Sequence, residues 1–392
     1  MADKAYITPK VLKWARESAR MSLEAAAAKV SKNADQIKEW EEGITQPTIR
    51  QAETLAKAYR RPFALFFLPD VPRDFKPLQD FRKPNAKPLS TASLFIIREI
   101  QQKQAWISDV YRENKEKQLP FVGKYTIHSN PLEVAADILK TLKISPCHYT
   151  TDNPIKEWIN KAEAKGIFIS RTSFIHSKML LDYEEIQGFA VIDKYAPFVF
   201  INTDDWNAPQ LFTLVHELAH IWISESGVSN EIGLTINGHF NPIELFCNEV
   251  AANALMPLAL MNKVDKKVYS SFKNVFQTAK IFEVSAFAFL VRAYKLQQIS
   301  LPTYNGLKAT ADQEFKAFLK REEEKKAKLK AKQKEKISGP NYFRLLVNKN
   351  SFLFTQVVLD SFRGGYIEPT QASRLLNTQV NNFSKLEAFI NA

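Results

Sequence analysis

The chain has 392 residues, of which 45% are hydrophobic and 24% charged, a balance typical of soluble globular domains. No apolar run approaches the roughly 20 residues of a membrane helix, and the N-terminus lacks the apolar core of a signal peptide, so a cytoplasmic protein without a membrane partner is expected. Cys147 and Cys247 form no Cys-x-x-Cys pair, which argues against a disulfide framework or a cysteine-based metal cluster.

Residues 1–70 predict short helices with tight connections. An apolar pattern precedes Ser22, a good N-cap residue for a helix over residues 23–30. After a break, a helix over residues 35–42 ends at Gly43, and another follows from Ile49 to Tyr59. Two helices joined by about four residues have the spacing of a helix-turn-helix.

The proline-rich residues 71–92 are interpreted as a linker to a larger region, residues 93–300. Within that region the pattern changes from helical to strand-like and back. Helices are expected at residues 93–116, 131–142, 153–165, 207–223 and 243–256, with two more within 266–297. Strands are expected at residues 166–170, 186–192 and 197–201, which are short, apolar and β-prone.

The net charge of +12 is unevenly distributed. Residues 316–336 hold ten Lys or Arg and four Glu. Their net charge of +6 is half of the net charge of the whole chain. Such a run is more typical of a solvated helix than of a reader of DNA sequence, so residues 301–338 are interpreted as a charged helical linker. Residues 339–392 then predict a small C-terminal helical domain.

One motif carries chemistry: Leu-Val-His-Glu-Leu-Ala-His-Ile-Trp at residues 214–222. His216 and His220 share one helical face at this spacing, so both imidazoles can reach a single ion. Zinc accepts imidazole at about 2.0–2.1 Å in tetrahedral geometry, and a catalytic site leaves one position for water. Glu217 then lies beside that water and can act as its general base. The motif predicts a zinc peptidase rather than a chance match.

The third metal ligand is open to more than one interpretation. Glu244 and Asn248 share a helical face, so they can supply a carboxylate to the ion and an amide behind a ligand. Glu249 is a competing carboxylate on a different side of the same helix. His239 is another rival, although its loop also suits a substrate contact or no role at all.

Residues 166–257 resemble the ImmA/IrrE family of zinc metallopeptidases. The resemblance rests on Gly188-Phe-Ala-Val-Ile, Phe200-Ile-Asn, Phe212-Thr-Leu-Val-His-Glu-Leu-Ala-His and Glu244-x-x-x-Asn-x-x-Ala-Ala-x-Ala-Leu-Met-Pro. It departs mildly at Val250-Ala251, where the family usually has Phe-Ala.

This resemblance implies a central α+β, gluzincin-like domain with a small sheet, zinc as the cofactor and Glu244 as the third ligand. In similar enzymes a strand beside the active-site helix pairs with the peptide substrate, and residues 197–202 would be that strand here. The whole chain is expected to be α+β and mostly α.

Residues 1–70 also resemble Xre-type helix-turn-helix domains, through Trp40-Glu-x-Gly-x-x-x-Pro. The resemblance makes residues 35–42 the recognition helix. The side chains expected to face DNA are Lys32, Asn33, Gln36 and Lys38. The same helix carries four acidic side chains, which repel phosphate. Protein recognition, or weak DNA binding as a homodimer, stays an alternative.

The favoured function is a zinc-dependent regulatory endopeptidase. The resemblance implies that it hydrolyses a peptide bond in a specific protein, such as a repressor or antitoxin-like regulator, in a toxin–antitoxin or phage-defence setting. The alternative is a DNA-binding transcriptional regulator whose zinc domain senses a signal or is structural.

Overall fold

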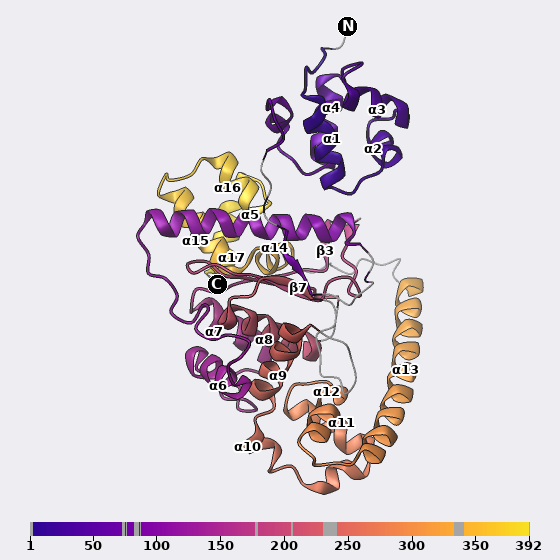
Figure 1. The fold of residues 1–392 in the computed structure, drawn as a ribbon, viewed down its shortest axis with the longest axis vertical. Helices are drawn as coiled ribbons and strands as arrows, with labels where there is room; N and C mark the ends of the chain where they lie inside the picture. The colour runs from indigo at the N-terminus through magenta and orange to yellow at the C-terminus, as the bar shows by residue number, and fades with distance from the viewer. Residues whose placement is uncertain are drawn as a thin grey trace. The chain divides into compact units, whose positions relative to one another are not determined.

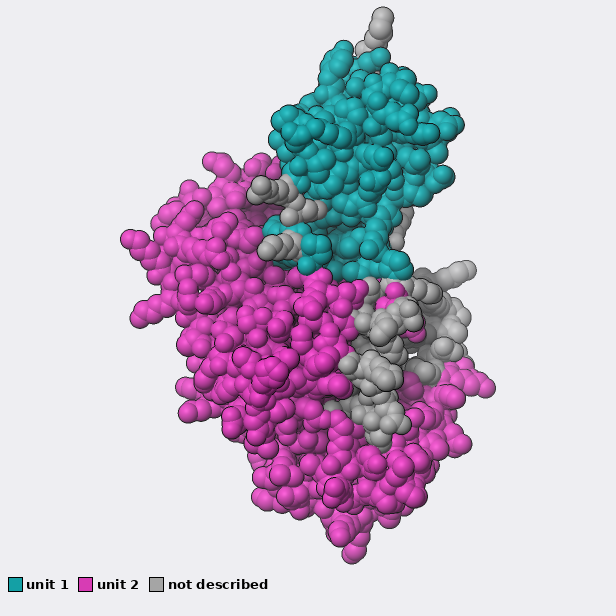
Figure 2. Space-filling view, in the orientation of Figure 1, with its two compact units in different colours: residues 1–77, 87–101, 174–181 teal, residues 78–86, 102–173, 182–392 magenta. Residues whose placement is uncertain are grey.

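The computed structural model describes residues 3–72, 75, 77–81, 86, 88–176, 179–204, 207–229, 241–332 and 341–391. The chain forms two compact units (Figure 2). The first comprises residues 1–77, 87–101 and 174–181, and the second comprises residues 78–86, 102–173 and 182–392.

The first unit contains a bundle of short helices near the N-terminus (Figure 1). Its elements are α1 (Pro9–Ser18), α2 (Leu23–Lys29), α3 (Ala34–Glu42), α4 (Ile49–Ala58) and η1 (Phe63–Phe67). Ser22 caps α2 by accepting from the backbone N–H of Ala25, as its position in the sequence predicts. Gly43 ends α3 with φ +77°, a conformation that glycine adopts without steric cost. The predicted helices of this region are therefore confirmed.

The same unit includes a short antiparallel pair, β3 (Phe174–His176) with β4 (Met179–Leu180). The helix α5 (Thr91–Glu113) begins in the first unit and ends in the second.

A five-stranded mixed sheet organises the second unit. Its strands, in spatial order, are β1 (Gln79–Asp80), β7 (Gly227–Ser229), β5 (Gly188–Val191), β6 (Phe198–Ile201) and β2 (Phe168–Arg171). The central strands β5, β6 and β7 pair antiparallel, whereas β1 and β2 add in parallel at the two edges. The three predicted strands are confirmed, but β1 and β7 were not predicted, and β1 lies inside the segment interpreted as a linker.

The position of β6 corrects one expectation. Residues 197–202 were expected to pair with a substrate peptide, but β6 pairs with β5 on one side and with β2 on the other. Because both of its edges are occupied, it has no free backbone groups for strand addition. The prediction that this strand binds substrate is therefore wrong.

Both faces of the sheet are covered at β5 and β6, which explains why these two strands are buried and apolar throughout. On one face, Phe168 and Phe198 stack with ring centroids 4.7 Å apart, and Phe198 meets Phe354 edge-on. On the other face, Val199 and Ile201 join the helical core around α8 (Asn207–Ile223).

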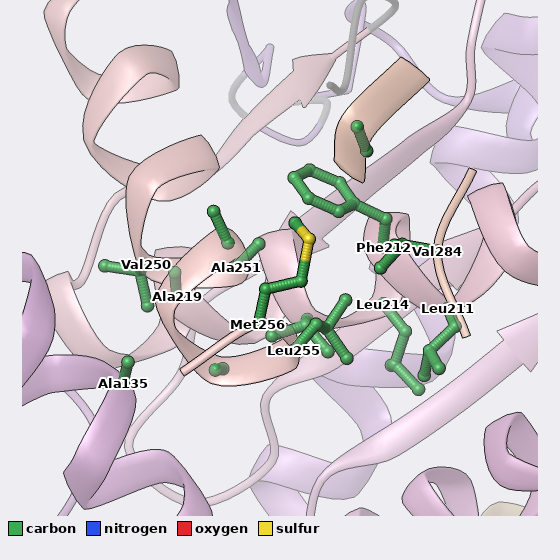
Figure 3. Close-up of a cluster of buried hydrophobic side chains, with 14 of the residues drawn as sticks. Ala135, Leu211, Phe212, Leu214, Ala219, Val250, Ala251, Leu255, Met256 and Val284 are labelled. Atoms are coloured by element: carbon green, nitrogen blue, oxygen red, sulfur yellow. The ribbon is translucent and has the colours of Figure 1, made fainter. Parts of the chain in front are cut away.

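That helical core lies chiefly between α8, α9 (Pro242–Leu255) and α6 (Pro131–Leu142). Figure 3 shows Leu211, Phe212 and Leu214 of α8 close to Leu255 of α9 and to Met256. The remaining helices of this part are α7 (Pro154–Glu163), α10 (Leu258–Met261), η2 (Lys266–Ser270), α11 (Phe272–Ile281), α12 (Ala286–Lys295) and α13 (Leu301–Lys332). The fold is α+β and mostly α, as predicted.

Among the described residues, no single helix has the length and apolar character needed to cross a membrane. Taken together, α11 and α12 are long and apolar enough by length and composition alone, but the chain bends by 94° at the break between them.

The C-terminal residues belong to the second unit and help to cover its sheet (Figure 1). Their elements are α14 (Tyr342–Asn350), α15 (Phe352–Arg363), α16 (Pro369–Leu376), η3 (Val380–Asn382) and α17 (Phe383–Ile390). Ser170 of β2 donates to the carbonyl of Lys349 at 2.5 Å, and Lys103 donates to the side chain of Asn350 at 2.8 Å. These buried hydrogen bonds fix the turn between α14 and α15 against the sheet.

Glu163, at the end of α7, holds the same turn. Its Oε1 accepts from Ser351 Oγ at 2.6 Å and from the backbone N–H of Phe352 at 3.0 Å. Burial raises the pKa of this carboxyl to about 7, although the hydrogen bonds from Ser351 and nearby backbone N–H groups oppose the rise. The folded protein thus binds a proton at Glu163 that the unfolded chain releases near pH 4.5.

This difference predicts that the stability of the wild type falls as the pH rises from about 4.5 to 7, because the folded state then binds more protons than the unfolded state. A rise of about 2.5 pKa units corresponds to about 3 kcal/mol at most. Urea unfolding at pH 5, 6, 7 and 8 measures the effect. Glu163→Gln is expected to lose this decline, whereas Glu133→Gln, at an exposed position, is expected to retain it. Parallel pH profiles for Glu163→Gln and the wild type would contradict the assignment.

Candidate metal centre

Three buried side chains from two neighbouring helices converge in the second unit. His216 and His220 come from consecutive turns of α8, and Glu244 comes from the first turn of α9. The two Nε2 atoms lie 3.1 Å apart. Glu244 Oε2 lies 3.2 Å from Nε2 of His216, and Glu244 Oε1 lies 3.2 Å from Nε2 of His220. The structure therefore brings together the two predicted imidazole ligands and the favoured third ligand.

These separations fit a single ion. Ligand atoms at about 2.0–2.1 Å from a tetrahedral centre lie about 3.3 Å from one another. The two Nε2 atoms are 3.1 Å apart, and each lies 3.2 Å from a different carboxylate oxygen of Glu244, which is close to that value. The donor set of His216, His220 and Glu244 can thus hold a metal with little rearrangement.

Two further side chains orient the donors. Asn248 Oδ1 lies 2.9 Å from Nδ1 of His216. Because a carbonyl oxygen only accepts, Nδ1 carries the proton and Nε2 presents its lone pair toward the other donors. On the opposite side, Ser229 of β7 donates to Glu244 Oε1 at 3.0 Å. Asn248 was predicted in this supporting position, whereas Ser229 was not.

Glu217 lies beside this cluster and has no exposed surface. Neither of its carboxylate oxygens has a hydrogen-bond partner among the described residues. Burial, together with the nearby carboxylate of Glu244, raises the pKa of Glu217 well above its usual value. A buried carboxyl group without a partner is unusual in a folded protein and indicates a role beyond stability.

Gly188 of β5 makes room for this carboxyl group. A β-carbon at position 188 would lie 2.9 Å from Glu217 Oε1 and 2.7 Å from Thr213 Cγ2. The glycine at this strand position therefore lets the backbone of β5 approach the helix that carries the motif.

The charges of the cluster oppose one another. Burial lowers the pKa of His220, against the raising effect of Glu244. Burial raises the pKa of Glu244, but the attraction and hydrogen bonds of His216 and His220 outweigh it and leave that pKa well below its usual range. Glu244 is consequently a carboxylate at neutral pH, which is the form that binds a cation.

The two alternative third ligands considered from the sequence were Glu249 and His239. Glu249 forms an ion pair with Lys295 and lies 3.7 Å from Arg292 NH1, so its carboxylate is engaged on another side of α9. His239 lies outside the described residues. Among the described residues, the geometry therefore favours Glu244, as the sequence did.

Two residues near the cluster were missed by sequence reasoning, Ser229 and Phe81. Phe81 follows β1, and its ring stacks on the imidazole of His220 with centroids 5.4 Å apart and an interplanar angle of 12°. Both lie in or beside strands of two or three residues, which are too short to show a periodicity. The available signal was an aromatic residue in a proline-rich segment, and it did not distinguish Phe81 from the nearby Phe75.

Ser229→Ala is expected to weaken metal binding by about 10- to 100-fold, because groups that orient ligands contribute on this scale. Its hydroxyl holds Glu244 Oε1, and both groups are buried. A competition titration with a chromophoric chelator measures the affinity. Ser226→Ala, at a half-buried position in the same part of the chain, serves as the control. Equal affinities for the two variants would show that Ser229 does not position the carboxylate.

The four residues predicted to face DNA have mixed positions in the first unit. Lys32 is exposed, and Lys38 Nζ lies 3.8 Å from Glu42 Oε1. Asn33 caps α3 by accepting from the backbone N–H of Gln36 at 2.9 Å. Gln36 donates from Nε2 to Glu39 Oε2 at 2.9 Å. Three of the four side chains, Asn33, Gln36 and Lys38, thus have partners within the domain, and the contact of all four with DNA stays a prediction.

Comparison with known proteins agrees with this architecture. Residues 162–294 match the family model of the IrrE N-terminal-like domain, which is a peptidase family, and residues 12–66 match the family model of a helix-turn-helix. No curated protein sequence matches the chain. The first match contains all three members of the donor cluster, together with Glu217. The chain therefore carries one segment that matches a helix-turn-helix model and a second segment that matches the model of an IrrE N-terminal-like peptidase domain.

Proposed function

We propose that the chain is a zinc-dependent endopeptidase that cleaves a specific regulatory protein. The observation that carries this proposal is the buried cluster of His216, His220 and Glu244, beside which the carboxyl group of Glu217 has no hydrogen-bond partner among the described residues. Two imidazoles and one carboxylate are a donor set that suits zinc, and they leave one position open.

His216, His220 and Glu244 would hold the ion. Zinc, when bound in such a site, supplies a Lewis acid and lowers the pKa of a bound water molecule. Asn248 keeps the proton on Nδ1 of His216, so that Nε2 stays available. Ser229 orients Glu244 by donating to its Oε1.

Glu217 performs the proton transfers. In its carboxylate form it accepts a proton from the attacking water, and it then delivers that proton to the nitrogen of the leaving amine. Burial and the neighbouring Glu244 carboxylate raise its pKa, which favours the protonated form that delivers the proton to the leaving amine. The small residue Gly188 leaves space beside this group.

The N-terminal domain supports a selective rather than a general protease. A helix-turn-helix is a recognition module, and its fusion to a peptidase domain suits the cleavage of one regulator, such as a repressor or an antitoxin-like protein. A toxin–antitoxin or phage-defence system is a setting in which such cleavage would act as a switch.

The test compares the N-termini of cellular proteins after expression of the wild type or of Glu217→Gln. New termini that appear only with the wild type would identify both the activity and the substrate. If the same termini appeared with Glu217→Gln, the assigned mechanism would be wrong.

A DNA-binding regulator is the second candidate, because residues 12–66 match a helix-turn-helix model. Against it, α3 carries four acidic residues and one Lys, which gives the helix a net charge of about −3. A gel shift with the promoter of the gene itself tests it, with Lys32→Ala and Lys38→Ala as variants. Sequence-selective binding that weakens in both variants and with added salt would favour this candidate.

A further inference from the structure

The edge of the sheet beside the metal centre is occupied by the chain itself. β1 pairs in parallel with β7, with Gln79 opposite Gly227 and Asp80 opposite Val228. The backbone N–H of Phe81 extends this pairing by donating to the carbonyl of Val228 at 3.1 Å. The other edge of β7 is paired with β5, so β1 takes the edge that β7 would otherwise leave open.

Phe81 joins this edge to the metal centre. It is 5% exposed, and its ring lies flat on the imidazole of His220. Gly227 makes room for the ring, since a β-carbon at that position would lie 2.0 Å from Phe81 Cε2. Replacement of Gly227 by any other residue would therefore displace Phe81. The backbone of β7 and the ring of His220 thus form a seat for one large, flat apolar side chain.

This segment buries little of its surface. β1 has two residues, and the side chains of both Gln79 and Asp80 are exposed. Among the described residues from 75 to 90, Phe81 is the one that is buried. A segment with few buried contacts opens at a low free energy relative to the global unfolding of the protein.

The closed state is incompatible with cleavage of a protein chain. His216, Glu217 and His220 are all fully buried, so a peptide bond cannot reach Glu217 while the site keeps this arrangement. Some covering element must therefore leave before a substrate binds, and the segment whose Phe81 ring lies on His220 is a candidate because little of it is buried.

We propose that residues 78–81 are an intramolecular inhibitor of the metal centre, and that a substrate peptide takes their place. This inference rests on the proposed peptidase function. The occupant that replaces them is an extended peptide, which pairs with the open edge of β7 and presents a large apolar or aromatic side chain in the seat of Phe81. The segment follows the helix-turn-helix domain in the chain, so a partner bound to that domain can shift the balance between the closed and open states.

The experiment uses the full-length zinc-loaded protein and two variants, Phe81→Ala and Gln79→Ala. Gln79→Ala is the matched control, because it removes an exposed side chain from the same strand and keeps the backbone pairing. The probe is an internally quenched peptide with a polar sequence around one central Phe. Phe81→Ala is expected to cleave this peptide about tenfold faster than the wild type, because the apparent activity of a mostly closed enzyme scales with its open fraction. Gln79→Ala is expected to match the wild type.

A second measurement, of zinc exchange and zinc affinity, distinguishes two roles for Phe81: covering the metal site, or holding His220 in place. If Phe81 only covers the site, Phe81→Ala exchanges zinc with a chelator about tenfold faster in both directions, whereas its zinc Kd stays near the wild-type value. If Phe81 instead holds His220 in place, zinc Kd rises in Phe81→Ala and peptide cleavage falls, which overturns the proposal.

The remaining outcomes separate this proposal from the proposed function. Unchanged cleavage and unchanged zinc exchange in Phe81→Ala, with an active wild type, would overturn the inhibitory segment and leave the peptidase intact. If zinc exchanged faster in Phe81→Ala but neither the wild type nor the variants cleaved the peptide, the covering role of residues 78–81 would be supported and the proposed peptidase function would be overturned.

Discussion

Glu217→Gln is expected to bind one zinc ion per chain and to lose peptide hydrolysis by about 100- to 10,000-fold, the usual contribution of a general acid–base group. Gln has nearly the same shape as Glu but cannot accept the proton of the attacking water. The proposed metal ligands His216, His220 and Glu244 are unchanged in this variant. Initial rates on a cleaved peptide and the zinc content of the purified protein measure the two effects.

The surroundings of Glu217 make this substitution informative. Neither of its oxygens has a partner among the described residues, so an amide in its place breaks no described hydrogen bond and should leave the fold intact. Glu225→Gln, at a partly exposed position just after α8, is the matched control and should keep wild-type activity. Full activity in Glu217→Gln would show that another group transfers the proton.

Glu244→Ala is expected to weaken zinc binding by more than about 100-fold, because residues that merely orient a ligand already contribute 10- to 100-fold. The substitution removes the atoms that lie 3.2 Å from the Nε2 atoms of both imidazoles. Zinc competition titrations measure the affinity, and circular dichroism shows whether the fold is retained.

Glu249→Ala is the control for this prediction. It removes a carboxylate of the same helix that pairs with Lys295 and lies near Arg292. Its zinc affinity is expected to equal that of the wild type. If Glu249→Ala lost zinc and Glu244→Ala retained it, the assignment of the third ligand would be reversed.

The elements that carry the cluster could be predicted because their signals are local. α6 occupies residues 131–142 and α8 residues 207–223, the ranges expected from the sequence. In α6, Asn130 caps the helix and Pro131 occupies its first turn, which are both short-range signals for a helix start. The histidines of the motif then share a face because the helix repeats every 3.6 residues.

The features of the site that were not predicted depend on contacts between residues far apart in the chain. Phe81 precedes His220 by well over 100 residues. A two-residue strand has no periodicity from which the stacking of these two rings could be predicted. Ser229 likewise reaches Glu244 only because β7 pairs with β5. The wrong expectation for residues 197–202 has the same origin, since strand order, and not strand composition, decides which edge is open.

The contacts between the C-terminal helices and the sheet mean that residues 162–294 are not expected to fold when they are moved alone into another protein. The segment that matches the IrrE N-terminal-like domain ends at residue 294, yet Phe354 packs on Phe198 and Ser351 bonds to Glu163. Removal of residues 342–363 would expose the aromatic face of β2 and β6 to water. A chimaera that exchanges only residues 162–294 would separate Phe198 and Glu163 from their partners Phe354 and Ser351, so an exchange is expected to preserve the fold only when both segments are exchanged together.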